Sequence, residues 1–189
     1  IASENENINI EIKSMLSSKT FKVFSSQDTQ GVELAGALKN IYAICCGIAH
    51  AKLVGENALG FIVTRSMAEM SRFAVAKGAN PITFLGLAGM GDLMATCTSK
   101  LSRNFQLGEL IAEDLSLIAA KEKVGQVAEG ARTLEVVYHE ANKMNVSMPL
   151  VNSLYKILYS DSSSDQLIQD LLDHPNEVDV EFTYKEKKL

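Results

Sequence analysis

Hydrophobic positions recur with a helical period from Gly31 to about residue 173. Apolar residues three and four apart predict helices over about 31–53, 56–78, 81–87, 102–112, 127–144, 149–159 and 164–173. Glycine-rich or polar turns separate these segments, at 77–80, 89–92 and 160–165. Only three prolines occur in 189 residues, which favours long uninterrupted helices over a β-sandwich. The pattern therefore predicts a mainly α fold, with one all-helical domain making up most of the chain.

The first 28 residues follow a different pattern. Ser3 and Glu6 fit a capping box ahead of a short amphipathic helix, and residues 21–24 are typical of a strand. A helix followed by a strand is half of a β-α-β unit, and one strand alone would leave its backbone groups unpaired. We therefore interpret residues 1–28 as a short α/β remnant of a domain whose earlier strands are absent from this chain. Residues 29–176 would form the helical domain, and the charged residues 177–189 a flexible tail.

Composition excludes several classes of function. The net charge of −5 argues against broad binding of nucleic acid or of an anionic membrane surface, because both need a basic face. The longest apolar run, Ile41 to Ala51, is too short to span a bilayer, and the start of the chain does not resemble a signal peptide. Three cysteines without metal-ligand spacing are typical of free thiols in a reducing compartment, which predicts a cytoplasmic protein. Because the chain does not begin with Met, we expect a fragment of a longer protein.

Lys39 is the most unusual charged residue of the helical pattern. Its helical neighbours at three, four and seven residues are uncharged, and most are small: Val32, Ala35, Gly36, Tyr42, Ala43 and Cys46. Loss of hydration disfavours an ammonium ion and lowers a lysine pKa, which is the usual origin of a proton-transferring lysine. The alternative is a lysine whose long side chain reaches from an apolar surface to water. Asn40 also lies among small or apolar residues, so its amide needs a specific partner.

Two further segments carry candidate chemistry. Asp92 follows the turn Gly89-Met90-Gly91, which lacks a preceding strand and so does not fit a dinucleotide fingerprint. Asp92 either faces a pocket or simply caps the next helix. Farther along, Ser102 fits the N-cap of a helix, so that the free N–H groups there and Arg103 would form a site for an anion such as phosphate. A capped helix with a solvated arginine is the alternative.

Taken in order, these segments resemble a known family. GALKN at 36–40, GMGDL at 89–93, LSRN at 101–104 and GQVAEG at 125–130 closely resemble the C-terminal domain of bacterial NAD(P)-dependent glycerol-3-phosphate dehydrogenases. The resemblance covers about residues 1–174, and the opening remnant resembles the end of that family's Rossmann domain. It implies a helical fold like the C-terminal domain of 6-phosphogluconate dehydrogenase. It also implies reversible reduction of dihydroxyacetone phosphate to sn-glycerol 3-phosphate for glycerophospholipid synthesis.

The resemblance also implies roles for individual residues. Lys39 matches the family's proton donor or acceptor, and Val127 and Glu129 match cofactor contacts. The substrate-binding set implied in the same way is Lys39, Asn40, Asp92, Thr96, Ser102, Arg103 and Asn104, of which Thr96 is the looser match and Arg103 also meets the cofactor. NAD(P)H would be bound mainly by the missing N-terminal domain, which carries the glycine fingerprint, so we expect this fragment to be inactive alone.

Two other interpretations remain open. One is a related dehydrogenase with a helical C-terminal domain, such as a 6-phosphogluconate or 3-hydroxyacid enzyme, although the Ser-Arg-Asn run and the GMGD turn argue against it. The other is a helical binding or dimerisation module without catalysis, against which the retention of Lys39, Asp92 and Arg103 argues. A homodimer through the exposed ends of the helices is compatible with either.

Overall fold

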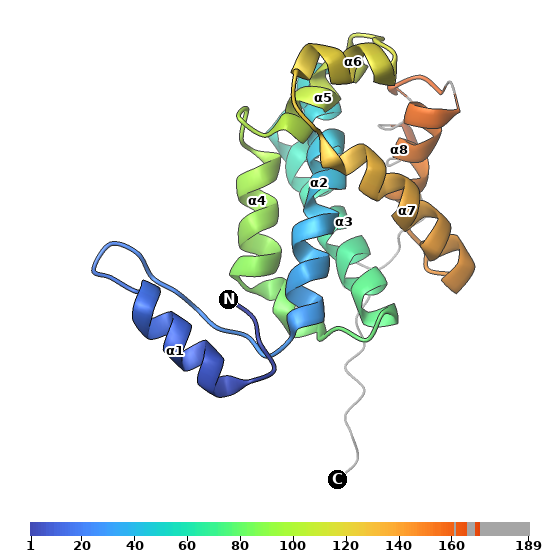
Figure 1. Ribbon diagram of the computed structural model, residues 1–189. Helices are drawn as coiled ribbons and strands as arrows, with labels where there is room; N and C mark the ends of the chain where they lie inside the picture. Colours follow the sequence, from blue (N-terminus) through green and yellow to red (C-terminus); the bar gives the residue numbers. More distant parts are fainter. Residues whose placement is uncertain (161, 166–168, 171–189) are drawn as a thin grey trace.

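A computed structural model of the chain describes residues 1–160, 162–165 and 169–170. Helices dominate these residues, and they surround one long central helix (Figure 1). In chain order the elements are α1 (Glu6–Leu16), α2 (Thr29–Ala51), α3 (Glu56–Ala76), the 3₁₀ turn η1 (Pro81–Leu85), the π-helical turn η2 (Leu87–Gly91), α4 (Asp92–Cys97), α5 (Arg103–Ala112), α6 (Leu117–Val124), α7 (Glu129–Met144) and α8 (Pro149–Tyr159).

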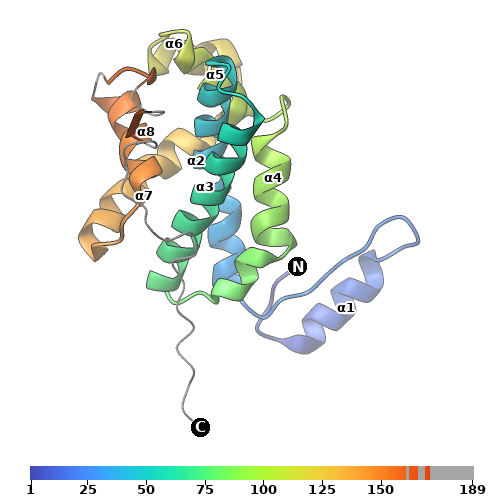
Figure 2. The same cartoon turned by 180° about the vertical axis from the view of Figure 1, so that it is seen from behind.

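Helix α2 is the core of the bundle. Its residues 41–49 are all buried, and α3, α4, α5 and α7 pack around it (Figures 1 and 2). Among the described residues it is also the one helix that is long and apolar enough to cross a membrane, by length and composition only. In this fold its apolar surface is covered by the other helices of the bundle, which accounts for the composition.

Helix α5 lies closest to α2, and a glycine makes this approach possible. A Cβ atom at Gly108 would overlap the carbonyl oxygen of Ile44 and lie 2.9 Å from the backbone nitrogen of Ile48. The two backbones therefore meet without side chains between them. This crossing fixes the start of α5, which carries Ser102 and Arg103, against the middle of α2.

A buried carboxylate joins α8 to the bundle. The N-cap of α8, Met148, offers no side-chain hydrogen bond, and Glu69 of α3 takes over that role. Its carboxylate accepts hydrogen bonds from the N–H groups of Leu150 (2.6 Å) and Val151 (3.3 Å) and from the Tyr42 hydroxyl (3.2 Å). Burial raises the pKa of Glu69 from 4.5 to about 7, although these hydrogen bonds and the charge of Arg72 act in the opposite direction.

The first 28 residues lie beside the bundle rather than in it (Figure 1). The predicted strand over residues 21–24 was wrong, because that segment is extended but pairs with no strand, and one parallel bridge joins Ala2 to Ser26. The predicted capping box was also wrong: Asn5 caps α1, and the Ser3 hydroxyl accepts from the Asn5 N–H instead. Extended backbone on both sides of α1, joined in parallel, retains the outline of a β-α-β unit.

Other predicted elements differ in detail. The helix predicted at 81–87 is a 3₁₀ turn followed by a π-helical turn, and α6 was not predicted. The helix predicted at 164–173 lies partly outside the described residues, and the predicted flexible tail at 177–189 lies wholly outside them. The division into domains at residue 28 stays a prediction.

Candidate active site

Lys39 and Asp92 form an ion pair between α2 and α4. Nζ of Lys39 donates to Oδ2 of Asp92, and the two side chains are 22% and 38% exposed. Asp92 is the first residue of α4 and makes no capping bond, so of the two alternatives for Asp92 the structure does not bear out the ordinary N-cap. Lys39 does not simply reach water either, because its partner comes from a helix 53 residues away along the chain. The helical neighbours of Lys39 in the sequence carry no charge, and the fold brings the carboxylate of Asp92 to it.

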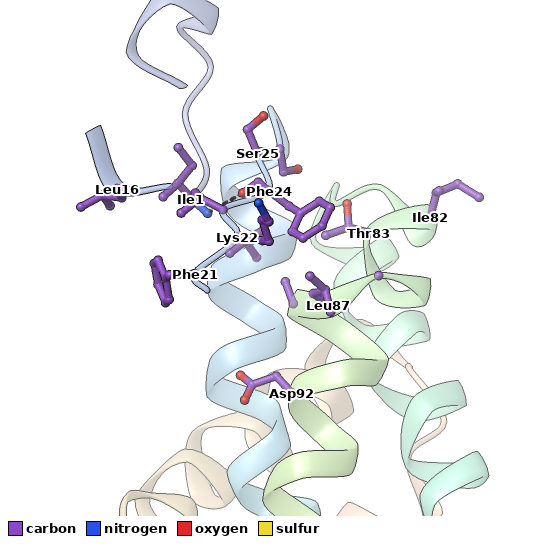
Figure 3. A pocket seen from close by; sticks show the side chains of 15 residues that line it. Ile1, Leu16, Phe21, Lys22, Phe24, Ser25, Ile82, Thr83, Leu87 and Asp92 are labelled. Atoms are coloured by element: carbon purple, nitrogen blue, oxygen red, sulfur yellow. Dashed lines mark hydrogen bonds between the residues drawn. The ribbon is translucent and has the colours of Figure 1, made fainter. Parts of the chain in front are cut away.

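Asp92 also lines a broad cavity between the N-terminal segment and the bundle. The cavity measures about 920 Å³ and is bounded by residues 21–26 on one side and by α2, η1 and η2 on the other. In Figure 3, Phe24 lies above Leu87, and the carboxylate of Asp92 points toward α2. Asp92 therefore borders a space whose walls are mostly apolar and in which Lys22 is the other charged residue of the lining, while Lys39 lies behind Asp92 and does not line the cavity itself.

The start of α2, and with it the cavity wall, is fixed by Asp28. This N-cap residue accepts from the Gly31 N–H (2.9 Å), the Asn80 N–H (3.0 Å) and the Thr83 hydroxyl (2.6 Å). Burial raises the pKa of Asp28, but these three hydrogen bonds outweigh burial and hold the pKa below its ordinary value of 3.8. Asp28 thus ties η1 to the helix that carries the lysine.

An amide network begins one residue beyond the lysine. The Asn104 Nδ2 group donates to Asn40 Oδ1 (3.0 Å), and Asn40 Nδ2 donates to the Gly36 carbonyl (3.2 Å). Asn104 Oδ1 accepts from the backbone N–H of Gly130 (2.9 Å). The unusual partner that Asn40 needs is therefore Asn104, which also reaches the start of α7. Gly130 was missed in the sequence, where only its place at the end of GQVAEG marks it.

Arg103 connects the same region to the loop before α7. Ser102 caps α5 by accepting from the Phe105 N–H (3.4 Å), as predicted, and leaves Arg103 exposed at the helix start. Nη1 of Arg103 donates to the Val127 carbonyl (3.4 Å), and the Val127 side chain is 73% exposed. Val127 and Glu129 line a second cavity of about 880 Å³ with the cations Lys121 and Arg132.

Thr96 stands apart from these connections. Its hydroxyl donates to the Asp92 carbonyl within α4 (2.6 Å) and is half-buried one turn from the ion pair. No group of three or more His, Cys, Asp or Glu side chains able to hold a metal occurs among the residues described. Cys45, Cys46 and Cys97 are buried and free, and burial raises the pKa of the Cys45 thiol well above its ordinary value of 9. The polar side chains that the structure brings together around Lys39 are a carboxylate, an arginine and two amides.

The described residues thus form a helical bundle that presents a lysine–carboxylate pair at the wall of a cavity, a combination that fits the C-terminal domain of a dehydrogenase and that the comparisons with known proteins identify. Residues 28–169 match the family model described as the C-terminus of NAD-dependent glycerol-3-phosphate dehydrogenase, and the chain belongs to this family. The resemblance seen in the motifs is thereby confirmed.

Curated relatives with similar sequences carry the same description. A glycerol-3-phosphate dehydrogenase [NAD(P)+] of Alcanivorax borkumensis is 50% identical over 96% of this chain and 53% of its own length. The enzyme of that description from Pseudomonas aeruginosa is 47% identical over 96% of this chain and 54% of its own length. The chain thus spans about half the length of the curated relatives it matches.

Solved structures share the fold. The crystal structure of glycerol-3-phosphate dehydrogenase from Coxiella burnetii matches with a TM-score of 0.87 and 36% identity, over 92% of this chain and 53% of that one. The glycerol-3-phosphate dehydrogenase of Plasmodium falciparum matches with a TM-score of 0.82 over 93% of this chain and 52% of that one. At 22% identity, this second match shows the fold alone. The all-helical fold predicted from the sequence is confirmed.

Proposed function

We propose that this chain is the substrate-binding and proton-transferring half of an NAD(P)-dependent glycerol-3-phosphate dehydrogenase. The whole enzyme would interconvert dihydroxyacetone phosphate and sn-glycerol 3-phosphate, which supplies glycerophospholipid synthesis. The observation that carries the proposal is the ion pair of Lys39 with Asp92, whose carboxylate residue lines the cavity between the N-terminal segment and the bundle.

Lys39 is the proton donor in this reaction and the acceptor in reverse. During reduction its ammonium group donates a proton to the oxygen that develops negative charge at C2, and during oxidation the neutral amine takes the hydroxyl proton. The carboxylate of Asp92 holds Nζ in place between turnovers. Asp92 could either orient the lysine or bind a substrate hydroxyl, and its hydrogen bond with Lys39 supports the orienting role.

The substrate phosphate would bind at the start of α5. Ser102 caps this helix, its unpaired N–H groups attract an anion, and Arg103 is exposed beside them. Asn40 and Asn104 lie next to Lys39 along the amide network, and the Asn104 Nδ2 group has a second hydrogen available for a substrate oxygen. Thr96 is half-buried and lies one turn from Asp92. Holding the phosphate fixes the distance from C2 to the lysine.

The second cavity fits one edge of a dinucleotide. It combines the exposed Val127 with two cations, Lys121 and Arg132, and two carboxylates, Glu122 and Glu129, so that the cations suit phosphate groups and the carboxylates suit ribose hydroxyls. NAD(P)H, when bound, supplies the hydride for the C2 carbon. Arg103, Val127 and Glu129 would hold it on this side, and Arg103 would also meet the substrate phosphate. The remaining contacts belong to sequence outside this chain.

The test restores the full-length polypeptide and follows NADH and NADPH absorbance with dihydroxyacetone phosphate. We expect turnover in the wild type, and a loss of at least about a hundredfold in kcat for Lys39→Ala with an unchanged circular dichroism spectrum. Lys39→Arg keeps a charge for Asp92 but cannot release its proton, so it should fold normally and stay inactive.

Lys77→Ala is the matched control, because Lys77 forms a comparable ion pair with Glu140 (2.7 Å) between α3 and α7. It should retain activity. An inactive wild type would refute the proposed function. Near-normal rates in Lys39→Ala would show that another group transfers the proton.

A further inference from the structure

The start of α7 rests directly on the backbone of α2, one residue beyond Lys39. A Cβ atom at Gly130 would lie 2.5 Å from the Asn40 carbonyl oxygen and 2.7 Å from Asn104 Oδ1. Real Cβ atoms essentially never approach oxygen so closely, so any side chain at this position would push α7 and α2 apart by several tenths of an ångström or more. Gly130 therefore sets the distance between the two helices at this point.

Asn104 holds the same junction by hydrogen bonds. Ala128, the N-cap of α7, makes no side-chain capping bond, and Asn104 Oδ1 instead accepts from the Gly130 N–H. The other end of the same amide donates to Asn40. Asn104 is only 7% exposed, so water does not replace these bonds easily. One buried amide thus links the first turn of α7 to the residue that follows the lysine.

We propose that Gly130 and Asn104 are positioning residues that fix the 125–129 loop relative to Lys39. The inference rests on the proposed function, in which that loop contacts NAD(P)H and Lys39 transfers the proton. The distance between the 125–129 loop and Lys39 then decides whether the hydride reaches C2 of the substrate while the proton reaches the oxygen on the same carbon. Asn104 would act in two ways, through its remaining Nδ2 hydrogen on the substrate and through its carbonyl oxygen on α7.

The experiment measures the dissociation constant of NADH alone, by calorimetry, in the full-length protein without substrate. Gly130→Ala moves the loop by steric overlap, and Asn104→Ala releases it by removing the capping bond. A residue that only binds substrate would leave NADH affinity unchanged. Because a lost hydrogen bond or a shift of this size corresponds to about tenfold in affinity, we expect each variant to bind NADH about tenfold more weakly.

Kinetics add a second readout. For Gly130→Ala we expect kcat to fall by about tenfold to a hundredfold, because a shift below about 1 Å misaligns the reacting groups. KM for dihydroxyacetone phosphate should change by a smaller factor than kcat, since Ser102 and Arg103 are anchored on α5 by its crossing with α2 and, of the α5 residues, only Asn104 is crowded by the new Cβ atom. In the double variant Gly130→Ala/Asn104→Ala, kcat should be no lower than in the more affected single variant, because both changes disrupt the same contact between α7 and α2. A general loss of stability would not lower kcat while leaving KM less affected.

Gly60→Ala is the matched control. Gly60 is a helical glycine in α3 with no atom within 4 Å of the place that a Cβ would occupy, and it lies away from the junction. Its NADH affinity and kinetics should equal those of the wild type. NADH dissociation constants within about twofold of wild type for both Gly130→Ala and Asn104→Ala would overturn the inference, even with the enzyme fully active.

A third measurement separates this inference from the proposed function. Amide hydrogen exchange of residues 128–131 should be faster in Asn104→Ala than in the wild type, because the Gly130 N–H loses its acceptor. If the wild type fails to reduce dihydroxyacetone phosphate, the proposed function falls, while NADH affinity and exchange still decide the positioning role. Unchanged exchange in Asn104→Ala would overturn that role whatever the activity. If Gly130→Ala does not fold, the Asn104→Ala measurements decide alone.

Discussion

Replacing Glu69 by Gln should change how the stability of the bundle depends on pH. Glu69 is fully buried among Tyr42, Leu150 and Val151, and burial raises its pKa from 4.5 to about 7. The folded state binds this proton more tightly than the unfolded state, so protonation of Glu69 adds to the free energy of unfolding. This stabilisation is fully present below pH 4.5 and is lost as the pH rises from 4.5 to about 7. Above about pH 7 the free energy of unfolding no longer depends on Glu69 titration. Glutamine carries no proton to lose.

The size of the effect follows from the two pKa values. The difference between about 7 and 4.5, at about 1.36 kcal/mol for each pKa unit, corresponds to about 3 kcal/mol. Unfolded chains are already partly ionised at about pH 5, so about 2.5 kcal/mol of this change falls between about pH 5 and about pH 8. The glutamine side chain would still accept from the Leu150 N–H, and its amide would donate to the Tyr42 oxygen, so the fold should persist.

Urea denaturation of the chain, followed by circular dichroism, measures the free energy of unfolding at each pH. The stability of Glu69→Gln relative to wild type should rise by about 2.5 kcal/mol from about pH 5 to about pH 8. Glu56→Gln, an exposed change at the start of the same helix, serves as the control and should show a nearly constant difference. A difference for Glu69→Gln that stays within about 0.5 kcal/mol across this range would refute the reasoning.

Two further predictions follow from the site and the core. Asp92→Asn should lower kcat/KM of the full-length enzyme at least about tenfold, since Lys39 loses its charged partner. Asp92→Glu keeps the charge and should restore part of the rate. Equal rates in the two variants would argue against an orienting role for Asp92. Gly108→Ala should cost about 1–3 kcal/mol or more of unfolding free energy in urea, because α5 and α2 must separate. Gly60→Ala, with open space at its Cβ position, should be neutral or slightly stabilising, and a neutral Gly108→Ala would contradict the close crossing.

The long helices could be predicted from the sequence because their hydrophobic period is clear. Helices α2, α3, α5, α7 and α8 begin and end within two residues of the predicted bounds. Helix α6 was missed because it is only eight residues long, so its apolar face of Leu117, Ala120 and Val124 spans too few turns to show a helical period. The turn around residues 86–91 was misread because glycines allow a π-helical turn that no periodicity marks.

The site was only half predictable, for a different reason. Lys39 stood out in the sequence because its helical neighbours are uncharged, and Ser102 stood out because it fits an N-cap. Both observations depend only on residues nearby in the sequence. The partner of Lys39 lies 53 residues away, and the partner of Asn104 in α7 is a backbone N–H, which carries no sequence signal. Pairing across the fold therefore had to come from the three-dimensional arrangement.

The arrangement of charges in the site has a physical logic. The ion pair of Lys39 and Asp92 is partly exposed, whereas the neutral amide of Asn104 is buried and that of Asn40 is half-buried. Burying the charged pair as deeply would cost desolvation energy that its attraction does not fully offset, while neutral amides can be buried once their hydrogen bonds are made. In the proposed reaction, this partly exposed pair would therefore exchange Asp92 for a substrate oxygen. The buried network cannot exchange partners easily, and this makes it suited to hold α7 at a constant distance from the lysine.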